Sequence, residues 1–378
     1  MEFRDLKTQY LQNKEAIDAA IQNVLISGTF IGGEPVKMLE KKLAEYVGVK
    51  HCITCANGTD ALLLALMAWG VGAGDAVFVP DFTFFSTAEV VPCVGATPVF
   101  VDVEEDTFNI SVASLEEAIK HILDEGKLIP KVVIAVDLFG QPAEYPKIRK
   151  LTEEYGLLLL EDGAQGFGGK IGEKNACSFG DISTTSFFPA KPLGCYGDGG
   201  AIFTDNGEWA ELMQSYKVHG KGVDKYDNVR IGMNSRLDTI QAAILLAKLD
   251  KFINEEIDKV NAVAESYNEL MKGVVKIPII REGYRSSWAQ YTIQLKDKKE
   301  RDVLQQYLKE KGIPSMIYYA KTMHEQIAFE GQEIVTDLDE TSRLCDVVLS
   351  LPMHPHISME EIDKVCNTIK GELEILRI

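Results

Sequence analysis

The feature that most constrains the fold is an alternation of strand-length apolar runs with helical patterns over the first two-thirds of the chain. Unalternating apolar runs lie at Ala76–Val79, Val132–Asp137 and Leu157–Glu161. Helical spacing lies between them, as at Thr59–Trp69, at Ser114–Glu125, where Ser114 opens the predicted helix, and at Tyr145–Tyr155. Strands of this kind are buried on both faces, and intervening helices favour a mostly parallel sheet. The sequence therefore predicts an α/β fold whose ligands bind at the carboxyl ends of the strands.

The length of 378 residues predicts more than one hydrophobic core, because single cores stop growing at roughly 250–300 residues. We expect a large domain over residues 1–250 and a smaller α+β domain over residues 251–378. A long helix from near Leu237 past Asn261 is predicted to connect them. The smaller domain is predicted to hold strands at Ala289–Leu295 and Ile313–Tyr319 and helices at Glu300–Lys311 and Met359–Leu376.

Charge and cysteine usage exclude several classes of protein. The net charge of −18 argues against nucleic acid or a membrane surface as the main partner. The first residues lack the pattern of a secretory signal, and no apolar run reaches the length of a membrane helix. Seven scattered cysteines fit reduced thiols, so we expect a cytoplasmic protein. Cys52 and Cys55 have redox spacing, but they lie in an apolar run and are predicted to be buried core.

A candidate anion site directly follows the strand that contains these cysteines. Ala56–Asp60 joins a strand to a helix, so free N–H groups at the helix start can face an anion. Gly58 allows a close backbone approach, and Thr59 adds a hydroxyl. An ordinary capped strand-to-helix turn explains the same residues equally well.

Asp162 and Lys191 are the candidates for chemistry. Asp162 ends a buried apolar run, where a carboxylate needs a partner such as a protonated pyridine nitrogen. The alternative is an Asp that caps the following turn, which has the same sequence pattern. Lys191 lies between Pro189 and Pro192, which restrict its backbone, and partial burial lowers a lysine pKa toward nucleophilic use. A lone lysine is ordinarily exposed, but a carboxylate for the ring nitrogen and a lysine for the aldehyde form the pairing typical of pyridoxal phosphate.

With these motifs in this order, the sequence resembles the DegT/DnrJ/EryC1/StrS sugar aminotransferases, from Phe30–Gly33 to Ser350–Pro355. The resemblance implies fold type I, the aspartate aminotransferase-like fold of pyridoxal 5'-phosphate (PLP) enzymes, and a homodimer with shared active sites. It implies that Lys191 is catalytic and carries the cofactor as a Schiff base. The other implied cofactor contacts are Asp162 at the pyridine nitrogen, Gln165 near the ring hydroxyl, Phe84 stacked on the ring, Gly58, Thr59 and Ser186 at the phosphate, and Asn234 reaching the phosphate from the neighbouring subunit.

The segments Phe187–Ala201 and Asn234–Leu246 resemble one branch of the family, the 3-aminotransferases of Wbp/Wlb-type pathways. That branch implies a substrate, UDP-2-acetamido-2-deoxy-3-oxo-glucuronate, with glutamate as amino donor, in the synthesis of the O-antigen of lipopolysaccharide. The alternatives are an aminotransferase for a dTDP-3-oxo- or dTDP-4-oxo-6-deoxyhexose, a PLP-dependent sugar dehydratase and a non-catalytic regulator. Dehydratase relatives carry histidine in place of the lysine, so Lys191 disfavours that reading.

Three further residues are predicted to contact substrate. Arg236 is the candidate cation for substrate carboxylates, with a salt bridge at a helix start or a dimer interface as its alternative. Tyr318 and His324 lie in a segment that lacks the Tyr-Pro pattern common in the family. No metal is predicted, because His324, His354 and His356 lack ligand spacing.

Overall fold

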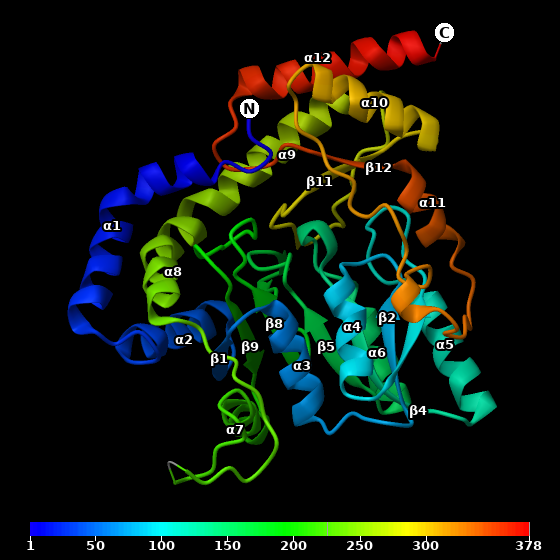
Figure 1. The fold of residues 1–378 in the computed structure, drawn as a ribbon. Coiled ribbons are helices and arrows are strands. Elements are labelled where there is room, and N and C mark those ends of the chain that lie inside the picture. Colours follow the sequence, from blue (N-terminus) through cyan, green and yellow to red (C-terminus); the bar gives the residue numbers. More distant parts are fainter. Residues whose placement is uncertain (225, 378) are drawn as a thin grey trace.

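The computed structural model describes residues 1–224 and 226–377. Its centre is a seven-stranded sheet (Figure 1). In spatial order the strands are β1 (His51–Cys55), β9 (Gly200–Thr204), β8 (Ile182–Ser186), β5 (Leu158–Asp162), β4 (Ile129–Val136), β2 (Asp75–Pro80) and β3 (Thr97–Val101). Strands β8, β5, β4, β2 and β3 pair in parallel, and β9 is antiparallel to both of its neighbours. This mostly parallel sheet confirms the predicted α/β fold class.

Helices cover both faces of the sheet because its strands are apolar on both sides. Val132 and Ile134 of β4 face one helical layer, while Val133 and Ala135 face the other. The first layer contains α3 (Gly58–Ala68), α4 (Phe85–Cys93) and α7 (Gly207–Tyr216). The second contains α5 (Val112–Glu125), α6 (Tyr145–Tyr155), α2 (Glu34–Val47) and α8 (Thr239–Lys251).

The long connecting helix is confirmed. It runs through α8, a π-helical turn over Phe252–Glu256, and α9 (Ile257–Met271), and α1 (Leu6–Ser27) packs along α8. A separate hydrophobic cluster joins α9 with β11 (Tyr291–Gln294), α10 (Lys298–Glu310), β12 (Val348–Leu351) and α12 (Met359–Leu376). The division into domains at residue 250 stays a prediction. The remaining elements are β6 (Lys170–Ile171), β7 (Lys174–Asn175), β10 (Tyr284–Arg285), η1 (Leu138–Gly140), η3 (Ile327–Phe329) and α11 (Asp339–Val347).

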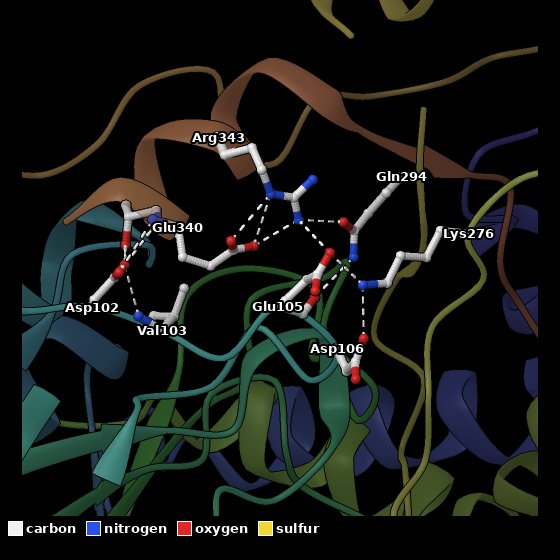
Figure 2. Close-up of polar contacts among 9 residues, drawn as sticks. Asp102, Val103, Glu105, Asp106, Lys276, Gln294, Glu340 and Arg343 are labelled. Atoms are coloured by element: carbon white, nitrogen blue, oxygen red, sulfur yellow. Dashed lines mark hydrogen bonds and ion pairs between the residues drawn. The ribbon is translucent and has the colours of Figure 1, made fainter. Parts of the chain in front are cut away.

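A polar network fastens the C-terminal elements to the loop after β3 (Figure 2). The Asp102 carboxylate accepts a hydrogen bond from the backbone N–H of Glu340, at 3.1 Å, in the first turn of α11. Arg343 of α11 bridges Glu340 at 2.6 Å and Glu105 at 3.1 Å. Lys276 also reaches Glu105, at 2.6 Å. Exposed ion pairs of this kind each contribute little, so the capping carboxylate is the stronger link.

Two predictions about local structure are wrong. Ile313–Tyr319 is not a strand: only Met316 bridges to Ser350 of β12, because Pro314 lacks an N–H and the chain then turns toward the large sheet. Helix α5 was predicted to open at Ser114, but it begins at Val112. The Ser114 hydroxyl instead accepts a hydrogen bond from the N–H of Asp102 at 3.1 Å, a long-range contact that helix periodicity does not reveal.

The cysteine pair behaves as predicted. Cys52 and Cys55 are buried, free thiols within β1, and burial raises the pKa of Cys55 to about 12. A thiol with so high a pKa forms little thiolate, which argues against redox use. Across residues 1–224 and 226–377, no helix has the length and apolar character needed to span a bilayer.

Candidate active site

A cavity of about 980 Å³ opens at the carboxyl ends of β5 and β8, beside the start of α3. Most of the predicted site residues line it, although they come from segments far apart in the sequence. These are Gly58, Thr59, Phe84, Asp162, Gln165, Ser186, Lys191 and Tyr318. The parallel register of β5 and β8 brings these residues together, because it places the carboxyl ends of both strands at one edge of the sheet.

Asp162 is the buried charge of this cavity, with 5% of its surface exposed. Its carboxylate accepts hydrogen bonds from the Thr87 hydroxyl at 2.8 Å and the Ala164 N–H at 3.2 Å. Burial raises the pKa of Asp162, while these two donors and Lys191 oppose the rise. In the described residues no cation lies within ion-pair distance of this carboxylate, so it can still accept a cationic ring nitrogen.

Lys191 lies on the loop that follows β8. Burial lowers the pKa of its amine, the Asp162 carboxylate opposes that shift, and the Arg4 guanidinium adds to it. The backbone N–H of Lys191 donates to the Phe188 carbonyl at 2.9 Å, which closes a tight turn. A fixed lysine with a lowered pKa is the arrangement that nucleophilic use requires.

The start of α3 forms a cradle for an anion. Asn57 caps the helix by accepting the Asp60 N–H at 2.8 Å. Within the described part of the chain, the N–H groups of Gly58 and Thr59 have no hydrogen-bond partner in the protein. A Cβ at Gly58 would stand 2.9 Å from the Cβ of Ser186, so only glycine lets these segments pack this closely. Free N–H groups, the helix dipole and two hydroxyls together suit a phosphate.

Two aromatic side chains and one amide shape the cavity wall. Phe84 is 53% exposed and presents its ring to the cavity, 6.4 Å from the ring of Tyr319. Gln165 donates to the Tyr319 hydroxyl at 3.1 Å and accepts the Phe139 N–H at 2.7 Å. The Gln165 amide thus already ties Tyr319 in place, and its predicted contact with the ring hydroxyl of the cofactor stays a prediction.

Three predicted residues do not line this cavity. His324 is bound to Asp81, with its Nδ1 at 2.6 Å and its backbone N–H at 2.8 Å from the carboxylate. Asn234 is exposed, in a bridge with Val218. Arg236 is half-buried and has no hydrogen-bond or ion-pair partner within residues 1–224 and 226–377. Their roles toward substrate or toward a neighbouring subunit therefore stay predictions.

The sequence reasoning missed Thr87, Tyr319 and Lys321. Thr87 lies one helical turn after Thr83 and bonds Asp162 across 75 residues, so no local pattern marks it. Tyr319 was passed over in favour of its neighbour Tyr318. Lys321 lines the cavity from the loop after it and would be read from sequence as an ordinary surface lysine.

A lysine and a buried carboxylate at adjacent strand ends, beside a phosphate cradle, define a fold type I PLP enzyme. The uncompensated charge of Asp162 and the free N–H groups of α3 fit this cofactor. The chain belongs to the DegT/DnrJ/EryC1/StrS aminotransferase family, whose profile matches residues 11–370. It is a PLP-dependent sugar aminotransferase.

Known relatives cover nearly the whole chain. The UDP-2-acetamido-2-deoxy-3-oxo-D-glucuronate aminotransferase of Pseudomonas aeruginosa is 42% identical, over 97% of this chain and 98% of its own. A crystal structure of a family aminotransferase from Brucella abortus is 49% identical with a TM-score of 0.96, over 98% of this chain and 99% of its own. A Bacillus subtilis structure with bound cofactor PMP is 29% identical with a TM-score of 0.87, over 96% of this chain and 82% of its own.

Proposed function

We propose that the protein transfers an amino group from glutamate to the C3 ketone of UDP-2-acetamido-2-deoxy-3-oxo-glucuronate. The observation that carries the proposal is the pairing of Lys191 with Asp162 at one cavity, in a chain 42% identical to the Pseudomonas aeruginosa enzyme of that specificity. We place the reaction in the cytoplasm, in the synthesis of O-antigen sugars.

Each residue of the cavity has a definite task in this proposal. When bound, PLP supplies the electron sink that acidifies the Cα–H bond of the amino donor. With the cofactor held there, the Lys191 amine, whose pKa is lowered, would accept the proton from the glutamate Cα and hold it on Nζ. Asp162 keeps the ring nitrogen protonated by opposite charge. For the sugar, Lys191 moves the proton in the reverse direction, onto C3.

The remaining groups hold and orient the reactants. Gly58, Thr59 and Ser186 would hold the cofactor phosphate through N–H and O–H donors, and Phe84, which lines the same cavity, would pack against its ring. The Phe84 ring excludes water from one face of the reacting atoms. These contacts cost little on binding because the donors are already in place in the protein.

Lys321 is the proposed contact for the anionic part of the substrate. Lys191 and Lys321 are the cationic side chains that line the cavity in the described structure, and Lys191 would be taken up by the cofactor. The ammonium of Lys321 has no hydrogen-bond or ion-pair partner within the described residues, so it can attract the C6 carboxylate of a uronate. Tyr318 lines the cavity from the same loop and would orient the sugar ring, whereas His324, bound to Asp81 outside the lining, would fix the end of that loop.

A homodimer completes the proposal. Exposed apolar side chains gather between α1 and α2, at Leu25, Ile26, Phe30, Ile31 and Met38. A patch of this kind typically marks a protein interface. Asn234 and Arg236, which do not line their own cavity, would then reach the cavity of the second subunit. Light scattering should give twice the 41.9 kDa of one chain.

The activity is tested with purified protein and PLP. Glutamate alone should convert the cofactor to its amine form, followed by absorbance. The aminated enzyme should then be consumed by the UDP-linked 3-oxo-glucuronate faster than by its neutral C6-hydroxymethyl analogue or by dTDP-linked 3-oxo- and 4-oxo-6-deoxyhexoses. Absence of the first conversion refutes transamination, and preference for a dTDP sugar refutes the substrate assignment. Lys191→Ala should abolish both steps.

A further inference from the structure

The segment Met1–Asp5 reaches the loop that carries Lys191. It lies beside the connection between β12 and α12, at the end marked N in Figure 1. From there the Nη2 of Arg4 donates to the Lys191 carbonyl at 3.0 Å and the Pro192 carbonyl at 3.3 Å. The two residues that accept these bonds are the proposed cofactor lysine and the proline that restricts its backbone.

Arg4 is itself held in position from both sides. The Phe3 carbonyl accepts the Met353 N–H at 3.2 Å, and the Phe3 ring meets Tyr318 edge-on at 6.3 Å. The Asp5 carboxylate caps α1 by accepting the backbone N–H of Thr8 at 2.8 Å. The guanidinium is therefore fixed relative to the C-terminal elements and to the cavity wall that contains Tyr318.

The lysine loop has few other anchors. Residues 188–194 contain no helix or strand. The Cys195 N–H bonds the Phe187 carbonyl at 2.8 Å, and the Lys248 ammonium donates to the Gly194 carbonyl. Arg4 supplies a side-chain hydrogen bond to the Lys191 carbonyl, while the Lys191 N–H is held only by the Phe188 carbonyl of the same loop, so loss of Arg4 would free this backbone.

The surroundings of Arg4 are unfavourable for a cation, so a structural ion pair does not explain its place. Burial lowers the pKa of Arg4 to about 10, and Glu256 only partly opposes that shift. Arg4 forms no ion pair within residues 1–224 and 226–377, and Lys248 and His354 lie close enough for its charge to lower the pKa of each. Arg4 is half-buried, and a charge partly withdrawn from water without an ion pair costs stability. This cost points to a role for Arg4 in holding the backbone carbonyls that it binds.

We propose that Arg4 is a positioning residue, which fixes the backbone of Lys191 and places a positive charge 3.0 Å from its carbonyl oxygen. This inference rests on the proposed function of Lys191. The Asp162 carboxylate raises the pKa of the Lys191 amine and the Arg4 guanidinium lowers it. Arg4 thus keeps the nitrogen ready to release its proton, and its hydrogen bonds keep that nitrogen aimed at the cavity.

Three variants of the full-length, PLP-loaded protein separate charge from geometry. Arg4→Gln keeps an N–H donor but removes the charge, and Arg4→Lys keeps the charge but loses the fork of donors. Lys7→Gln is the matched control, because Lys7 is an exposed cation in the first turn of α1, outside this cluster. The readouts are the pH midpoint of the cofactor absorbance and the rate of cofactor loss on dilution.

Arg4→Gln should raise the pH midpoint by on the order of 0.5 units, since a nearby positive charge is removed. Arg4→Lys should leave the midpoint within about 0.2 units of wild type. Both variants should lose cofactor roughly ten-fold faster, the cost of about one charged hydrogen bond. Variants indistinguishable from Lys7→Gln in both readouts overturn the inference. So does a midpoint that moves equally in Arg4→Lys and Arg4→Gln, because loosening alone would explain it.

Failure of the proposed function gives a different result. If Lys191 does not bind the cofactor, Lys191→Ala will keep the wild-type absorbance and its pH dependence. A changed spectrum in Lys191→Ala together with unchanged Arg4 variants would refute the role of Arg4 alone.

Discussion

Asp162→Asn is the most informative substitution in the cavity. Asparagine keeps the volume of the side chain and an oxygen that can accept the Thr87 hydroxyl, now at 2.8 Å, so the change removes little besides charge. Taking one partner from a buried ion pair costs about 3–5 kcal/mol. At 1.36 kcal/mol per factor of ten, the amino-group transfer from glutamate should slow by about a hundredfold to a few thousandfold.

The assay is a stopped-flow measurement of the glutamate half-reaction over a range of glutamate concentrations. The maximal rate should decrease, and the glutamate concentration at half-saturation should stay unchanged, because in the proposed function Asp162 contacts the ring nitrogen and not the amino donor. Glu89→Gln is the matched control. It removes a carboxylate from α4, the helix that carries Thr87, without touching the residues that line the cavity.

Stability separates this functional effect from a folding defect. Burial raises the pKa of Asp162 above 3.8, so the unfolded chain releases this proton more readily than the folded one. Stability is therefore lost as the pH rises from 3.8 through the folded pKa, and neutral asparagine avoids that loss. The melting temperature of apo Asp162→Asn should equal or exceed that of wild type. A transfer rate within about threefold of wild type, or a loss that tracks a lower melting temperature, would refute the reasoning.

Three further outcomes follow from the structure. Lys321→Gln should raise the KM for the uronate substrate on the order of ten-fold and leave the KM for the neutral analogue unchanged. Lys309→Gln, at an exposed lysine, is the control, and equal effects of Lys321→Gln on both substrates would contradict carboxylate recognition. Asp102→Ala should lower the free energy of unfolding by about 1–2 kcal/mol in urea titration, because it uncaps α11, whereas exposed Asp337→Ala should change it by less than about 0.5 kcal/mol. Burial lowers the pKa of His354 from 6.5 to about 4, so the unfolded chain binds a proton at this residue before the folded chain does. The free energy of unfolding should therefore decrease as the pH drops from 6.5 to 4, by at most about 3 kcal/mol. Urea titrations at about pH 7 and about pH 4.5 should show a smaller decrease for His354→Gln than for wild type, and an equal decrease would contradict the assignment.

Much of the fold was predictable because its signals are local. Apolar runs buried on both sides, helical spacing between them and a Pro-bounded lysine are visible within short windows of sequence. The same local reasoning failed at Ile313–Tyr319, where the apolar pattern resembles a strand but only Met316 pairs with β12. Whether a segment joins a sheet depends on a free strand edge and on backbone donors, and Pro314 removes one.

In the candidate site, too, some residues could be predicted from local sequence and others could not. The sequence by itself predicted the cofactor: Asp162, Lys191 and the glycine at the start of α3 have residue types and an order that suit PLP. Only the tertiary structure decided which other residues serve them. The Arg4 guanidinium bonds a carbonyl 187 residues away, and the Thr87 hydroxyl reaches Asp162 across 75 residues. Contacts at such separations depend on how helices and loops pack around the sheet, and side-chain packing leaves no periodic trace in the sequence.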